Sequence, residues 1–61
     1  MKIVMTNTAT KESKVVKFGE VCNIYYCGQY NSSGGRRVIN YKLLNNEVIK
    51  DGLVEFKREI N

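Results

Sequence analysis

The sequence lacks histidine, tryptophan and proline, and it contains two cysteines and six acidic residues among 61 positions. Without histidine, a serine or cysteine nucleophile has no partner of the kind that most often serves as its base. A structural zinc site needs about four Cys or His ligands in closely spaced pairs, and Cys22 and Cys27 cannot supply them. We therefore expect a chain that is not an enzyme and that holds no metal or other cofactor.

Long apolar runs are also missing. No segment approaches the roughly 18 apolar residues of a membrane span, and residues 1–7 turn polar too early for a signal peptide. If Cys22 and Cys27 share an extended segment, their five steps span roughly 16 Å, whereas a disulfide requires Cα atoms within about 7 Å. These features predict two cysteines that do not pair with each other, a cytoplasmic location and no membrane partner.

Positive charge exceeds negative charge, with ten Lys and Arg against six Asp and Glu and a net charge of +4. The resulting field favours polyanionic partners such as nucleic acid, although a charge of this size also serves solubility. The absence of linkers predicts one domain over residues 1–61. A chain this short buries only about 60% of its unfolded surface, so a homodimer that pairs edge strands is a further expectation.

Alternating apolar and polar residues predict four β-strands before residue 45. Their expected ranges are residues 2–7, 14–18, 20–30 and 36–44, with a polar loop over residues 8–13. One face of the third strand would carry Cys22, Ile24, Tyr26 and Tyr30, and the matching face of the fourth would carry Arg37, Ile39, Tyr41 and Leu43.

Residues 32–35, Ser-Ser-Gly-Gly, predict a hairpin between the third and fourth strands because glycine supplies the positive φ of a tight turn. Pairing Asn31 with Arg36 sets Ile24 beside Leu43. A register slip of one residue would mix polar and apolar side chains on both faces. This register therefore defines an inward apolar face and an outward polar one.

The last third of the chain fits two interpretations. Asp51-Gly52 is a strong hairpin signal that aligns Ile49 with Val54. However, Ile49, Leu53, Phe56 and Ile60 also have the spacing of an amphipathic helix over residues 46–60. We prefer the hairpin, which predicts an all-β fold: a five- to six-stranded antiparallel meander, forming a curved sheet or a small SH3-like or OB-like barrel. The alternative is an α+β fold with a C-terminal helix over about 46–60.

The outward face of the predicted central hairpin is the candidate binding site. There, an aromatic ring lies among cations and amides, an arrangement that can stack a base and contact phosphates. A solvent-facing strand would carry similar residues without any binding role. The candidate residues are Tyr25, Lys42, Arg36, Arg37, Asn40, Asn23 and Gln29.

Two functions fit these expectations. The preferred one is a small non-catalytic protein-binding module, a regulator or inhibitor of the kind that phages and mobile elements encode, which would bind by strand addition or an aromatic anchor. The composition, rich in Lys, Asn and Ile, is the hint of such a source. The alternative is a non-specific binder of single-stranded nucleic acid that uses the Tyr, Lys and Arg face of a small barrel.

Overall fold

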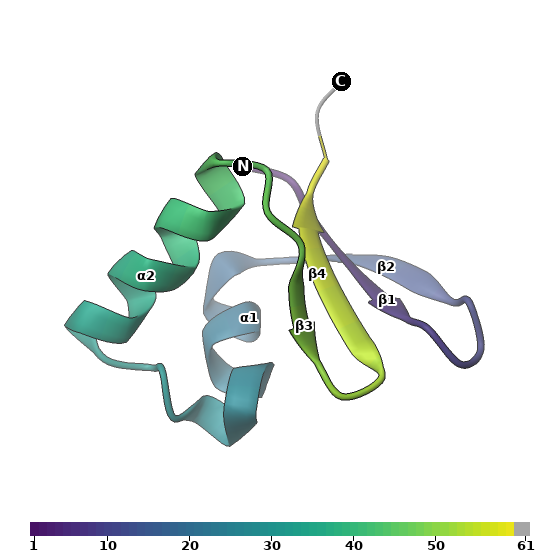
Figure 1. Cartoon of the computed structure of the whole chain (residues 1–61), viewed down its shortest axis with the longest axis horizontal. Coiled ribbons are helices and arrows are strands. Elements are labelled where there is room, and N and C mark those ends of the chain that lie inside the picture. Colours follow the sequence, from purple (N-terminus) through teal and green to yellow (C-terminus); the bar gives the residue numbers. More distant parts are fainter. Residues whose placement is uncertain (60–61) are drawn as a thin grey trace.

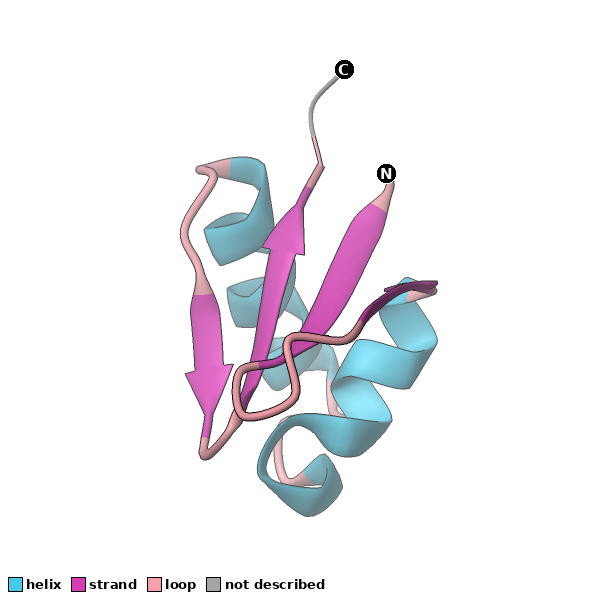
Figure 2. Cartoon of the chain, turned by 90° about the vertical axis from the view of Figure 1, so that its right-hand side faces the viewer, coloured by secondary structure: helices cyan, strands magenta, loops and turns pink. Residues whose placement is uncertain are grey.

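The computed structural model describes residues 1–59, and within them a four-stranded sheet packs against two helices (Figure 1). The elements follow one another as β1 (Ile3–Asn7), β2 (Ser13–Val16), α1 (Phe18–Ile24), the short 3₁₀ segment η1 (Tyr25–Gly28), α2 (Ser33–Leu44), β3 (Ile49–Asp51) and β4 (Val54–Arg58). The sheet order is β2-β1-β4-β3, with every neighbouring pair antiparallel. Both helices lie on the same side of the sheet, so the molecule has two layers (Figures 1 and 2).

The predicted N-terminal strands are present. β1 is central: Ile3 pairs with Val16 on one side and with Arg58 on the other. Alternation along β1 then turns Ile3 and Met5 toward the helices, and Ile3 is fully buried. The second strand is shorter than predicted, because it ends at Val16 and Phe18 begins α1.

The C-terminal hairpin is also present, and the alternative helix over residues 46–60 is wrong for the part of that range that the structure describes. The register differs from the predicted one: Asp51 pairs with Val54, which leaves Gly52 and Leu53 as the loop. Gly52 has a φ of +61°, which a glycine at the first loop position adopts without strain. Ile49 therefore lies opposite Phe56 and not Val54, and both side chains are buried.

The prediction of two central strands is wrong. Residues 20–30 and 36–44 lie in α1, η1 and α2, with a short connection, so no hairpin joins them. The all-β meander and the small barrel are therefore corrected to a mixed α+β fold with an antiparallel sheet. The α+β alternative had the right class, but it placed the helix in the segment that forms the β3–β4 hairpin.

Both ends of α2 have specific caps that explain why the helix begins and ends where it does. The Ser32 hydroxyl accepts a hydrogen bond from the Gly35 N–H at 3.2 Å, as an N-cap serine does. At the other end Asn46 has a φ of +62°. Its N–H donates to the Leu43 carbonyl at 3.0 Å, and the N–H of Glu47 donates to the Lys42 carbonyl at 2.9 Å. This pair of bonds is a Schellman motif, which satisfies carbonyls that the helix would otherwise leave open.

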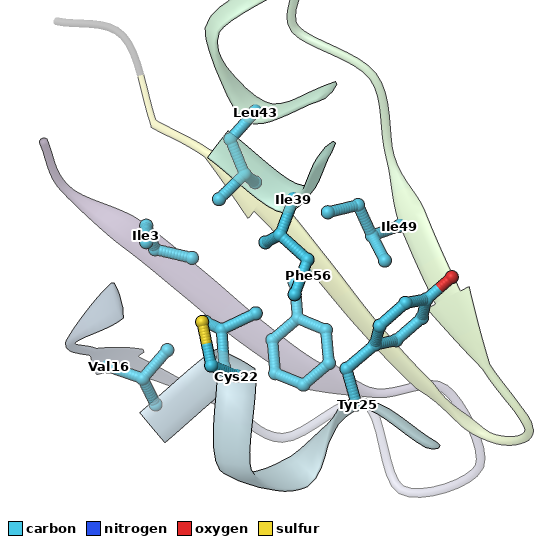
Figure 3. Close-up of a cluster of buried hydrophobic side chains, with 9 residues drawn as sticks. Ile3, Val16, Cys22, Tyr25, Ile39, Leu43, Ile49 and Phe56 are labelled. Carbon is cyan, nitrogen blue, oxygen red and sulfur yellow. The ribbon is translucent and has the colours of Figure 1, made fainter. Parts of the chain in front are cut away.

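Each of the seven elements contributes to the core. Its buried side chains are Ile3, Val16, Val21, Cys22, Tyr25, Ile39, Leu43, Ile49 and Phe56. Figure 3 shows the Phe56 ring among side chains from the sheet and from both helices. Cys22 is buried and Cys27 is exposed, and neither forms a disulfide. No helix in residues 1–59 has the length and apolarity needed to cross a membrane.

Candidate interaction surface

The structure does not form the outward face on which the candidate site was predicted. Tyr25, the expected stacking ring, is a core residue with 8% of its surface exposed. Asn23 lies on α1, where its Oδ1 accepts a hydrogen bond from the side-chain amide (Nδ2) of Asn31 at 2.7 Å. Gln29 is an exposed residue directly after η1. The strand alternation that grouped these side chains does not exist, because a helical segment turns successive residues by about 100° and not 180°.

The other four predicted residues share α2. Arg37 and Asn40 are exposed and Lys42 is half-buried. Arg36 is exposed, and its guanidinium lies 5.9 Å from the centroid of the Phe18 ring, within the range of a cation–π contact. The structure thus keeps the predicted cations together on one helix and removes the predicted aromatic from them.

Tyr25 instead belongs to a group of three tyrosines. Its ring centroid lies 4.5 Å from that of Tyr26 and 5.1 Å from that of Tyr30. Tyr26, Cys27 and Gly28 all have positive φ, at 47°, 55° and 83°, which reverses the chain after α1. The Tyr26 N–H donates to the Asp51 carboxylate at 2.8 Å and so ties this reversal to β3.

This environment predicts an alkaline loss of stability. Burial raises the pKa of the Tyr25 hydroxyl above its usual 10.0, and Tyr26, Tyr30 and Asp51 raise it further. Above about pH 10 the folded chain keeps a proton that the unfolded chain has released. The free energy of unfolding is therefore unaffected by this group below about pH 10 and decreases as the pH rises through the folded pKa. Tyr25→Phe removes this loss because phenylalanine does not ionise.

Urea unfolding of the parent chain and of Tyr25→Phe at pH 7 and at about pH 11 measures the effect. The variant should become more stable relative to the parent at the higher pH. Tyr41→Phe, which alters an exposed hydroxyl, is the matched control and should show no such change. An equal relative change in both variants would contradict the role of burial.

The outer face of α2 is an exposed apolar surface that the sequence did not predict. Ile39 and Leu43 point into the core, and the opposite side of the helix carries Val38, Tyr41 and Leu44 with 45%, 67% and 50% of their surfaces exposed. We refer to these three residues together with Arg37 as the outer face of α2. Val38, Tyr41 and Leu44 are three residues apart in the sequence, which is a helical spacing. The strand prediction instead places Tyr41 on an inward face.

The outer face borders a hollow of about 320 Å³, lined by Arg37, Val38, Tyr41, Lys42 and Glu47. Arg37 and Tyr41 form one row along the helix, four residues apart, and Val38 and Lys42 form the next. The hollow lies along the groove between these rows, where a side chain of another molecule can insert. It is thus a helix groove with apolar walls and a cation in each row.

Positive charge on α2 is not balanced nearby in the sequence. Residues 21–46 include three cations, Arg36, Arg37 and Lys42, and no acidic residue. In the part of the chain that the structure describes, ion pairs form only between Lys2 and Glu59 and between Lys50 and Glu55. The cations of α2 are therefore available to an acidic group on another molecule.

The open face of the sheet has a different character. Strand alternation places small and charged side chains there, namely Val4, Thr6, Ser13, Val15, Lys50, Glu55 and Lys57. Over residues 1–59, this face carries no aromatic ring on which a base could stack. No three His, Cys, Asp or Glu side chains gather closely enough within the same residues to hold a metal ion.

Comparison of the chain with protein-family models, with curated proteins and with solved structures gave no match. Its function is therefore inferred from its own side chains.

Proposed function

We propose that the chain is a small non-catalytic protein-interaction module that contacts its partner through the outer face of α2. The observation that carries this proposal is the exposure of Tyr41, at 67%, between two other exposed apolar side chains, Val38 and Leu44. Contiguous exposed apolar side chains gain free energy when a partner covers them. Tyrosine and arginine also contribute most often to the energetic centre of protein interfaces, and Tyr41 and Arg37 adjoin here.

The rigid position of α2 also supports this role. Its ends are capped, and Ile39 and Leu43 anchor it over β3 and β4. A surface held in place before binding loses less conformational entropy on association. A module of this kind acts as a regulator or inhibitor by occupying a surface that its partner needs.

A second candidate function, binding of single-stranded nucleic acid, is favoured by the three cations of α2, which could contact phosphates. It has less support because Tyr25 is buried and, among residues 1–59, the open face of the sheet carries no aromatic ring. Tyr41 is an exposed ring near the cations, but its neighbours Val38 and Leu44 are better suited to an apolar partner surface than to a phosphate backbone.

Homodimer formation through edge strands has the least support. β2 and β3 are the two edges of the sheet. β2 carries Lys14, and Lys11 and Lys17 lie just beyond its two ends. Lysines along an edge strand oppose pairing with an identical edge, because the pairing would bring like charges together.

Site-specific photo-crosslinking in cells tests the proposed function. A photoreactive phenylalanine derivative replaces Leu44 on the outer face, and a matched control replaces Val15, which is 60% exposed on the open face of the sheet. We expect a discrete adduct from position 44 that protease removes and nuclease does not. The adduct should disappear when Tyr41→Asp is added.

Each alternative result has a clear meaning. An adduct that nuclease removes would favour the nucleic-acid candidate. Equal adducts from positions 44 and 15, or none from either, would contradict the assignment of α2 as the contact surface.

A further inference from the structure

We infer that the groove on α2 receives an acidic amphipathic α-helix of the partner protein. This inference rests on the proposed function and specifies the chemistry of the partner. It is carried by two independent properties of the groove, which are its shape and the placement of charge along its walls.

The shape of the groove favours a helix. The row of Arg37 and Tyr41 and the row of Val38 and Lys42 are ridges with a four-residue spacing, and the hollow of about 320 Å³ lies between them. A second helix inserts its own ridge into such a groove, with the two axes crossing at roughly −50°. α2 has 12 residues and thus spans about 18 Å, which accommodates a helix crossing it at one point.

Charge on the walls favours acidic side chains in the occupant. Arg37 stands in one ridge and Lys42 in the other, and neither forms an ion pair among residues 1–59. A helix seated in the groove would place an apolar ridge against Val38 and Tyr41, with carboxylates on both sides to meet the two cations. Such pairs contribute chiefly to the choice of partner and its orientation.

The single acidic residue of the lining, Glu47, determines the expected orientation of the partner helix in the groove. Glu47 lies at the C-terminal end of the groove, after the cap of α2. The partner helix should therefore carry its carboxylates near Arg37 and Lys42 and a neutral or basic residue near Glu47. A second copy of α2 fits poorly, because its own Arg37 and Lys42 would face those of the first.

Two synthetic helical peptides test this inference on the full chain. The first, of about 18 residues, carries leucines at four-residue spacing flanked by glutamates, and the second has lysine in place of each glutamate. Circular dichroism checks that both peptides are equally helical. Titration of the isotope-labelled chain, followed by the NMR signals of its backbone amides, gives the affinity and the location of binding.

We expect the acidic peptide to shift the signals of residues 37–47 and to bind at least about tenfold more tightly than the basic peptide at low salt. The double variant Arg37→Glu/Lys42→Glu should reverse this preference, since both walls then carry negative charge. Lys57→Glu, which changes a cation on the open face of the sheet, is the matched control and should leave the preference unchanged.

Several results would overturn the inference. These are equal affinity for the two peptides, a preference that survives the double variant, shifts confined to other elements, and binding of neither peptide at millimolar concentration. Tighter binding of a single-stranded oligonucleotide to the same residues would assign the groove to nucleic acid. A protein adduct at position 44 without the acidic preference would keep the proposed function and reject the acidic helix.

Discussion

Replacement of Phe56 by alanine should remove a large part, or all, of the chain's free energy of unfolding at 25 °C. The ring is fully buried at the centre of the core (Figure 3), and Phe→Ala substitutions at such positions cost about 3–5 kcal/mol. Domains are stable by about 0.05–0.15 kcal/mol per residue, which amounts to roughly 3–9 kcal/mol for 61 residues. The loss of this one side chain is therefore comparable with the whole free energy of unfolding.

Urea unfolding followed by circular dichroism measures this loss, with Tyr41→Ala as the matched control. Both variants lose an aromatic ring, but that of Tyr41 is 67% exposed, and surface substitutions usually change stability by less than about 0.5 kcal/mol. Similar unfolding midpoints for the two variants would contradict the position of Phe56 in the core.

Replacement by alanine should change the stability of the chain in opposite directions at two adjacent glycines of α2, Gly34 and Gly35. A Cβ atom on Gly35 would lie 2.7 Å from the carbonyl carbon of Tyr30 and 2.8 Å from its Cα. Such an overlap forces the N-terminal turn of α2 away from the segment before it, and overpacking of this kind costs about 1–3 kcal/mol. A Cβ on Gly34 has no neighbour within 4 Å.

Gly34→Ala should therefore stabilise the chain by up to about 1 kcal/mol, because alanine favours the helix more than glycine does. Thermal unfolding of the two single variants separates the effects, since the chemical change is identical and only the surroundings differ. A stabilising effect of Gly35→Ala would show that α2 does not pack against Tyr30 as the structure describes.

The strands near both ends of the chain could be predicted from the sequence, and the helices between them could not. Ile3 and Met5 alternate with polar or outward residues, and Asp51-Gly52 provides turn chemistry between two apolar strands. In these segments local pattern and tertiary packing agree. The hairpin register still differed, because the burial of Ile49 against Phe56 determines the pairing and the turn residues permit more than one loop.

The pattern of residues 36–44 predicts a strand, although they lie in α2, because it satisfies both the strand and the helix period. Ile39 and Leu43 are four residues apart, which places them on one face of a strand and also on one face of a helix. Tyr41, between them, distinguishes the two cases: it would be inward in a strand, and it is 67% exposed on the helix. The serines and glycines of residues 32–35 predict a hairpin tip, whereas Ser32 in fact caps the helix.

The pattern of α1 and η1 is misleading for a similar reason. Cys22, Ile24 and Tyr26 alternate as a strand would, but the buried residues are Val21, Cys22 and Tyr25, with a helical spacing. The consecutive positive φ values that follow include Tyr26 and Cys27, which are residue types that rarely adopt them. Local propensity could not predict this reversal, which a hydrogen bond from the Tyr26 N–H to the Asp51 carboxylate of β3 helps to hold in place. The burial of Tyr25 could therefore not be predicted either.

The pairing of β1 with β4 has a consequence for synthesis. Residues 3–7 bond to residues 54–58, so the sheet cannot close until residue 58 has emerged from the ribosome. The 42 residues from Val16 to Arg58 take roughly 2–8 s to synthesise at about 5–20 residues per second. During this time the N-terminal hairpin lacks β4, and an isolated two-stranded hairpin is only marginally stable. Until β4 is available, one edge of β1 is unpaired and can associate with other strands.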